Sequence, residues 1–299
     1  MRHRINLAVL GLAVGTALAC SSPETIINTT AIPTAGLRFV NAVPDTSGAM
    51  GLDFRAIDIV ENSDSYRVLY RNALNTTSSL STTVPYLMQV QYKPAQAGSR
   101  HFRVFLDDTV QTVASTVLKD TTLSLVATHN YTAMMYGNAR SGGSDKMALK
   151  VWDETVPDPG AQIALRVVNT TGSPIDVRVY AVGSALPAAA DWSAVPAYTA
   201  SSYILKAPGS YMYNVQPAGG GTALTTADAL AMQGAAATVD IDAAPGTQVA
   251  GSAVSAFVFP RSTAGARTPQ TTTPFPSFAV PAIGFAWDRR PPRTCSPLC

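Results

Sequence analysis

Apolar and polar residues alternate along much of the chain with a period of two. In residues 100–106, Phe102, Val104 and Leu106 are separated by polar side chains, and the same alternation surrounds Arg166. Successive side chains of a β-strand point to opposite faces of its sheet. The pattern therefore predicts strands with one buried face and one solvated face, and it places Arg166 on the solvated one.

Many other segments have this strand-like pattern and are separated by turn residues. The further candidate strands are 50–57, 65–70, 86–92, 110–117, 122–127, 131–136, 146–152, 197–204, 210–216, 236–241 and 249–259. The composition also disfavours helix bundles, because the chain contains 21 glycines and 21 prolines. We expect an all-β protein built from antiparallel sandwiches.

An internal repeat divides the chain. Three segments recur in the same order: 37–41 (LRFVN) with 165–169 (LRVVN), 131–136 with 254–259, and 152–153 with 287–288. The offset between the copies drifts, as loop insertions produce, because loops tolerate length changes better than strands do. The repeat predicts two tandem immunoglobulin-like β-sandwiches of roughly 100–130 residues each.

The N-terminus has the organisation of an export signal. Residues 1–4 are basic, 5–18 are apolar but shorter than the ~20 residues that span a bilayer, and 17–19 are the small-x-small sequence of a cleavage site. Cys20 follows directly and resembles the acylated cysteine of a bacterial lipobox, although Ala17 stands where that motif usually has leucine. We expect lipidation of Cys20; ordinary secretion with a free thiol is the alternative.

The predicted organisation then runs from signal peptide through lipid anchor and tether, first sandwich, linker and second sandwich to a C-terminal tail. The boundaries are 1–19, 20–35, 36–156, 157–160, 161–291 and 292–299. Ser21 follows the anchor where an aspartate would resemble an inner-membrane retention signal, so the outer membrane is favoured.

The other two cysteines lie near the C-terminal end. An odd cysteine in an exported chain needs an explanation, and lipidation of Cys20 supplies it. Cys295 and Cys299 are then free to form a small-loop disulfide in an oxidising compartment. Two unpaired thiols are the alternative, whereas two thiolates without a nearby histidine do not make a closed zinc site.

Charge excludes one class of partner. Removal of residues 1–19 leaves equal numbers of basic and acidic residues, 19 of each, so the electrostatic footprint of a nucleic-acid-binding protein is absent. One basic cluster stands out, formed by Arg289, Arg290 and Arg293. It is either simply solvated or binds phosphate or a lipid headgroup.

Motifs for catalysis are absent from the sequence. It contains no G-x-S-x-G elbow, no Walker-type loop and no H-E-x-x-H. We expect His101 on the exposed face of a strand and His129 in a turn. Acidic residues cluster at 107–108, 153–154 and 240–242, where turn and capping roles are favoured over a calcium site. The sequence predicts no catalytic residue, no metal and no cofactor.

Tyr211 and Tyr213 share one face of a predicted strand. Exposed rings in such a row stack on sugars or hold a partner. The alternative is that both rings pack in the core or at a sheet edge.

The repeated LR[FV]VN segment and the Trp-Asp…Pro-Gly…Leu-Arg junction between the copies resemble the bacterial family known as domain of unknown function 4397. The resemblance covers most of 36–291 and is weakest in the second copy, which has Thr170-Thr171-Gly172 in place of a turn like Pro44-Asp45. It implies exported, often lipid-anchored proteins with tandem β-sandwiches, and it transfers no catalytic residue.

These observations together predict a non-enzymatic lipoprotein, held by its N-terminal lipid on the outer membrane and facing the periplasm or the cell surface. It would bind polysaccharide or an envelope protein, or act as a structural spacer. Two alternatives remain: an extracytoplasmic hydrolase of glycans or esters with a site assembled from distant loops, and a carbohydrate-binding module.

Overall fold

The computed structural model describes residues 32–44, 46, 51–56, 58, 86–87, 91–106, 111–239, 241–266 and 278–293. The predicted signal peptide, Cys20, Cys295 and Cys299 lie outside these residues. From Pro33 onward the chain forms one compact unit. In the described part, no helix is long and apolar enough to cross a membrane.

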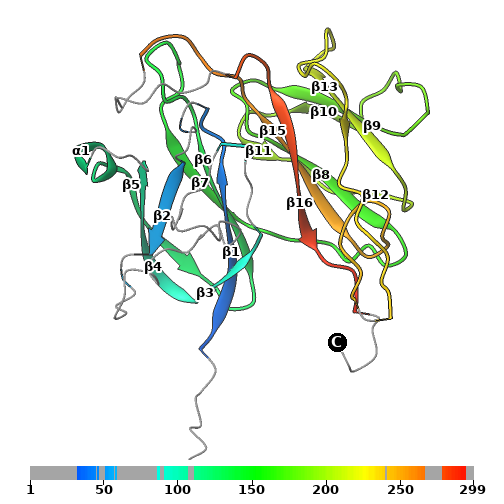
Figure 1. Ribbon diagram of the computed structural model, residues 1–299, viewed down its shortest axis with the longest axis horizontal. Helices are drawn as coiled ribbons and strands as arrows, with labels where there is room; N and C mark the ends of the chain where they lie inside the picture. The colour runs from blue at the N-terminus through cyan, green and yellow to red at the C-terminus, as the bar shows by residue number, and fades with distance from the viewer. Residues whose placement is uncertain are drawn as a thin grey trace, which may run out of the picture. The chain divides into compact units, whose positions relative to one another are not determined.

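The first half of this unit contains two sheets (Figure 1). Their strands are β1 (Thr34–Asn41), β2 (Leu52–Ala56), β3 (Lys93–Gln96), β4 (Gly98–Leu106), β5 (Val117–Leu125), β6 (Asn130–Tyr136) and β7 (Ala148–Asp153). One sheet has the order β3-β1-β6-β7 and the other β2-β4-β5. A short helix, α1 (Gln111–Ala114), precedes β5.

The second half also contains two sheets. Their strands are β8 (Ile163–Asn169), β9 (Ile175–Ala181), β10 (Trp192–Val195), β11 (Thr199–Ala200), β12 (Ile204–Lys206), β13 (Tyr211–Pro217), β14 (Ala229–Leu230), β15 (Ala253–Phe259) and β16 (Ala282–Arg289). One sheet has the order β11-β8-β15-β16, with β12 also paired to β8, and the other β10-β9-β13-β14.

A parallel strand pair lies in the middle of one sheet of each half. β1 pairs with β6 so that Arg38 lies opposite Thr132, and β8 pairs with β15 so that Arg166 lies opposite Ser255. Parallel pairs are typically buried on both faces. In agreement, β8 and β15 are buried at every position.

Three apolar clusters explain this burial. One fills the space between the two sheets of the first half, and a second does so in the second half. The third lies between the halves and joins Val40 and Met134 to Val168 and Phe257. The sheets β3-β1-β6-β7 and β11-β8-β15-β16 therefore pack against each other, and the four sheets stack as layers.

The all-β sandwich fold is confirmed. The expectation of one buried face per sheet is wrong for the two inner sheets, because each covers the other's outer face. Two candidate strands also differ: 110–117 begins with α1, and the described residues of 236–241 contain no strand. Candidate strand 65–70 lies outside the described residues.

Candidate functional site

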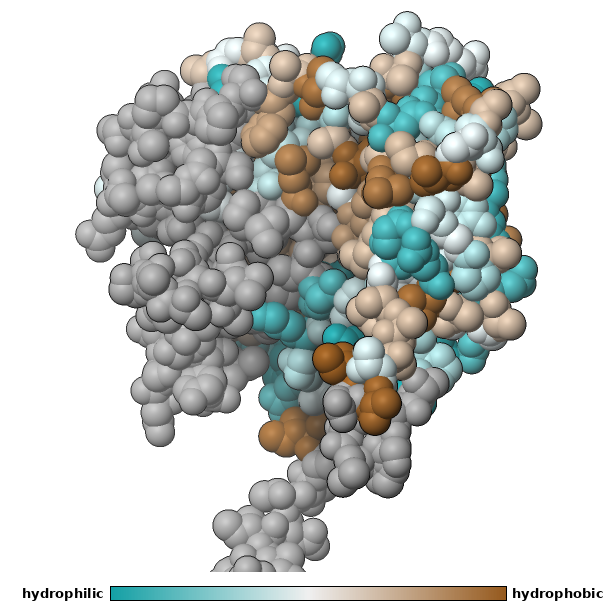
Figure 2. Space-filling view, turned by 45° about the vertical axis from the view of Figure 1, so that its right-hand side comes forward, coloured by the Kyte–Doolittle hydropathy of each residue, from teal (hydrophilic) through white to brown (hydrophobic). Residues whose placement is uncertain are grey.

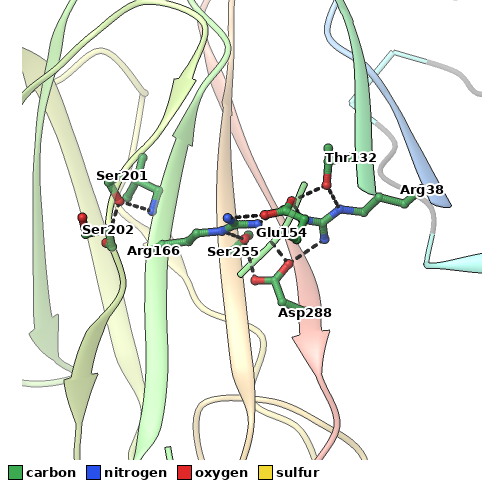
Figure 3. Close-up of polar contacts among 9 residues, drawn as sticks. Arg38, Thr132, Glu154, Arg166, Ser201, Ser202, Ser255 and Asp288 are labelled. Atoms are coloured by element: carbon green, nitrogen blue, oxygen red, sulfur yellow. Dashed lines mark hydrogen bonds and ion pairs between the residues drawn. The ribbon is translucent and has the colours of Figure 1, made fainter. Parts of the chain in front are cut away.

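Two arginines lie between the inner sheets. Arg38 on β1 and Arg166 on β8 point away from the core of their own sandwich and toward the other sandwich (Figure 3). Arg38 is fully buried and Arg166 is almost so. The sequence pattern predicts that Arg166 lies on a solvated face. This prediction is wrong, because the inner sheet of the first sandwich packs on that face and buries it.

Two carboxylates from the ends of β7 and β16 neutralise the arginines. Arg38 Nη1 lies 2.7 Å from Asp288 Oδ1, and its Nη2 donates to Glu154 Oε1 at 3.1 Å. Arg166 binds Glu154 with both terminal nitrogens, at 2.6 and 2.8 Å, and its Nη2 lies 3.5 Å from Asp288. Each carboxylate therefore contacts arginines of both halves. We call these four residues the ion network.

Hydroxyl groups complete the ion network in the same way on each side. Arg38 Nε donates to Thr132 Oγ1 at 2.7 Å, and Arg166 Nε donates to Ser255 Oγ at 2.6 Å. Ser255 Oγ in turn donates to Asp288 Oδ2 at 2.6 Å, as Thr132 does to Glu154.

The register explains why Glu154 and Asp288 correspond. Glu154 follows Trp152, the partner of Thr132, by two residues, as Asp288 follows Ala286, the partner of Ser255. Matching Trp152 with Trp287, as the sequence suggested, is therefore wrong by one residue here. The pairing of β15 with β16 is regular at these positions and bulges only beyond Trp287, at Asp288.

An aromatic ring lies against each guanidinium. Arg38 Cζ is 4.6 Å from the centroid of Tyr92, and Arg166 Cζ is 4.7 Å from that of Tyr203. Burial raises the pKa of both tyrosines above the ordinary value, so both rings stay neutral. Cation–π contacts of this kind contribute more where water is excluded.

The charges of the network hold each other ionised. Burial opposes ionisation of Glu154, but hydrogen bonds and charge from Arg166, together with the charge of Arg38, outweigh it and lower the pKa of Glu154. Burial also opposes the charge of Arg38, yet Asp288 and Glu154 raise its pKa above the ordinary value. Two cations and two anions make the network neutral as a whole, which suits a cross-link rather than a binding site for a charged ligand.

A second polar contact joins the two halves elsewhere. Tyr198, which has a φ of 57°, donates its hydroxyl to Asp145, and its carbonyl accepts from Lys150 Nζ at 2.7 Å. Its ring lies 4.2 Å from that of Tyr136. A left-handed φ is unfavourable for a bulky residue, so these contacts must hold Tyr198 in place.

The histidines border the surface and each contacts a carboxylate. His101, with 37% of its side chain exposed, pairs with Asp120 on the outer face of β4 and β5, as expected for an exposed strand position. His129 follows a turn, and its Nδ1 lies 2.6 Å from Asp153 Oδ2. The sequence predicted neither pairing, because the partners come from other strands.

His129 and Asp153 line an open pocket of about 400 Å³, which Glu154, Asp288 and Arg289 also border. The pocket therefore lies at the edge of the ion network. Among the described residues, no group of three or more histidine, cysteine or acidic residues is placed to hold a metal. Asp107, Asp108 and Asp240 lie outside them.

Tyr213 packs in the core of the second sandwich rather than on its surface. Its side chain is fully buried and its ring meets Phe285 edge-on, with 5.2 Å between centroids. Tyr211 is half-buried, packs against the same core and donates to the carbonyl of Ala207. Tyr213 therefore has no ring face to offer a sugar, and its placement matches the packing alternative.

Comparison with known proteins gives three results. No curated protein matches the chain. A solved structure, described as "Alpha-glucan recognition by family 41 carbohydrate-binding modules from streptococcal virulence factors", aligns over 66% of this chain and 87% of that chain, with 10% sequence identity and a TM-score of 0.22.

The third result is a match to a family model over residues 35–180. The match covers the first sandwich, β8 and most of β9. The resemblance to this family that the motifs predicted is confirmed over that range. Residues 35–180 match the family described as Domain of unknown function (DUF4397).

Proposed function

We propose that this chain is an exported lipoprotein of the bacterial cell envelope whose two sandwiches, two copies of one domain, act without catalysis as a single rigid binding or spacing module. The observation that carries the proposal is the ion network. It connects β1 and β7 of the first sandwich to β8 and β16 of the second through buried side chains.

A rigid pair of sandwiches differs from two domains on a loose linker. Interfaces between domains of one chain are typically polar enough to permit relative motion. Here the interface is dominated by an apolar cluster and encloses paired charges, so relative motion would expose unpaired buried charge. Such a module keeps both sandwiches at a fixed spacing, which favours a role in display or binding.

The lipoprotein half of the proposal rests on the sequence 1–20, with its basic start, short apolar stretch and Cys20. Mass spectrometry of the protein from cell membranes tests it, with Cys20→Ala as the control. We expect a diacylglyceryl mass on Cys20 and membrane fractionation that the control loses. A wild-type chain that is soluble and unacylated would disprove the anchor.

The rigid-module half is tested by limited proteolysis between the sandwiches. The link from Glu154 to Gly160 should resist cleavage in the wild type and become sensitive in Arg38→Met. Equal sensitivity would contradict a rigid interface.

The alternative of an extracytoplasmic hydrolase is favoured by one observation, the His129–Asp153 contact at the edge of the open pocket. A histidine oriented by a carboxylate is one part of a nucleophilic site. Assay of the purified chain against glycan and ester substrates, with His129→Ala and the matched variant His101→Ala, decides this. An activity lost only in His129→Ala would favour the hydrolase.

A further inference from the structure

Among the described residues, the most exposed apolar side chains lie at the end of the sandwich pair at which the N-terminal tether enters. β1 begins at Thr34 beside the start of β6, and β16 ends at Arg289 beside the start of β15. The open pocket, lined from both Asn130 and Arg289, brings these ends together. In Figure 1 β1 begins at the lower edge and the arrow of β16 points downward.

A narrow hairpin projects at this same end. Ala235 and Ala244 form its bridge, and Thr238 N donates to Ile241 O at 2.9 Å near its tip. Val239 is 88% exposed and Ile241 67%, the highest values among the described large apolar residues of the second sandwich. Neither contributes to the described core clusters, so folding does not explain an apolar tip.

One arginine contacts the base of the hairpin, and in the sequence Asp240 and Asp242 alternate with the two apolar residues of the tip. Arg293, whose side chain is 79% exposed, lies 3.4 Å from Asp242 on the hairpin, and Gly251 lies against Pro291 and Pro292. Arg290 lies over the ring of Trp287, with 4.8 Å between Cζ and the centroid. Figure 2 shows hydrophobic residues next to hydrophilic ones at the lower end of the described surface. An exposed aliphatic tip matches the chemistry of a bilayer interface, where such side chains enter the acyl region.

We propose that this end face, with Val239 and Ile241 at its tip, docks onto the surface of the membrane that holds the anchor. The inference rests on the proposed lipidation of Cys20. Fully extended, the chain from Cys20 to Pro33 spans at most about 3.6 Å per residue, or roughly 45 Å. The anchor therefore keeps the end face at high effective concentration near lipid, where a weak insertion suffices.

The test supplies the anchor chemically, so that it does not depend on acylation in the cell. A chain without residues 1–19, with Cys295→Ser and Cys299→Ser, is coupled through Cys20 to a maleimide lipid in vesicles of phosphatidylethanolamine and phosphatidylglycerol. A tryptophan is introduced as Val239→Trp. Its matched control is Val280→Trp, an exposed valine just before the opposite end of β16. Brominated phospholipids then quench tryptophans that reach the acyl region.

We expect the fluorescence added by Val239→Trp to be quenched at least two-fold more than that added by Val280→Trp. Ile241→Trp should behave like Val239→Trp, and circular dichroism shows whether each variant is folded. Equal quenching at positions 239 and 280 overturns the docking. If quenching is equal and sedimentation also shows a dimer, the end face binds a second copy of the chain and the membrane-docking proposal is wrong. Failure of acylation in cells would overturn the lipoprotein proposal alone, since the vesicle result is obtained without it.

Discussion

Arg38 and Asp288 form an ion pair of 2.7 Å, with both side chains fully buried, that joins the first strand of one sandwich to the last strand of the other. Taking charges out of water is costly, and mutual attraction returns that cost only where every partner is present. The ion pair is therefore less a source of stability than a condition on how the sandwiches dock. Any other arrangement would leave buried charges unpaired.

Removal of one member of the ion network should be strongly destabilising. We predict that Arg38→Met lowers the free energy of unfolding by about 3–5 kcal/mol, because Asp288 and Glu154 then face a single arginine. Denaturant unfolding measures the change. The matched control is Arg103→Met, which breaks the exposed pair of Arg103 with Asp120 and should leave the free energy of unfolding nearly unchanged, because solvent screens exposed ion pairs.

A double substitution separates lost pairing from lost packing. If Arg38→Met acts by leaving Asp288 unpaired, then Arg38→Met with Asp288→Asn should lose less than the sum of the two single changes, by about 0.5–3 kcal/mol. Additive losses would show that the two residues contribute independently, against the network described above.

Stability should depend on pH through Glu154. The pKa of Glu154 is lowered in the folded protein, so the unfolded chain binds the proton more tightly. The stabilisation by this group is therefore complete above its ordinary pKa of 4.5 and is lost as pH falls through the lower folded value.

We thus predict a free energy of unfolding that is nearly flat from about pH 6 to 8 and falls below about pH 5. Glu154→Gln should be less stable at neutral pH and show a shallower fall in acid. Asp153→Asn, at the neighbouring and half-exposed position, serves as control. An acid-side slope that Glu154→Gln leaves unchanged would contradict the assignment.

The alternation of apolar and polar residues predicted the strands of the outer sheets because one face of those sheets does meet water. In β4, for example, Phe102 and Val104 are buried while Arg103 lies on the outer face. The same rule placed Arg166 in solvent, since alternation reports the polarity of a face and not what covers it. One feature of the sequence does indicate that this face is covered. Val40 and Val168 each follow an arginine by two residues and so share its strand face, and a solvated face seldom carries an apolar residue between polar ones.

The ion network itself is outside the reach of local patterns. In the sequence Glu154 is one half of an acidic pair, and nothing near it in the sequence indicates its arginine partners on β1 and β8. Long-range pairing depends on how the sheets stack, which no window of neighbouring residues encodes.

Because Tyr213 is buried in the core, two substitutions there should differ greatly in their effect on the free energy of unfolding. Burial raises its pKa, and its hydroxyl has no hydrogen-bond partner among the described residues. Tyr213→Phe should therefore change the free energy of unfolding by less than about 1 kcal/mol, whereas Tyr213→Ala should lose about 3–5 kcal/mol through the cavity it leaves. Denaturant unfolding checks both. A large loss in Tyr213→Phe would reveal a partner for the hydroxyl.

Tyr198 should act at the interface and not within one sandwich. Tyr198→Phe keeps the contact with the ring of Tyr136 and removes the hydrogen bond to Asp145, which lies in the other sandwich. A hydrogen bond to a charged acceptor contributes about 1.5–3 kcal/mol, so we expect the free energy of unfolding to fall by that amount.

We also expect Tyr198→Phe to speed proteolysis in the loop 137–146, because the hydrogen bond to Asp145 holds that loop. Tyr180→Phe, which removes the equivalent bond to Asp228 inside the second sandwich, should leave proteolysis of 137–146 unchanged. Equal cleavage of the loop in both variants would show that Tyr198 does not hold the two sandwiches together.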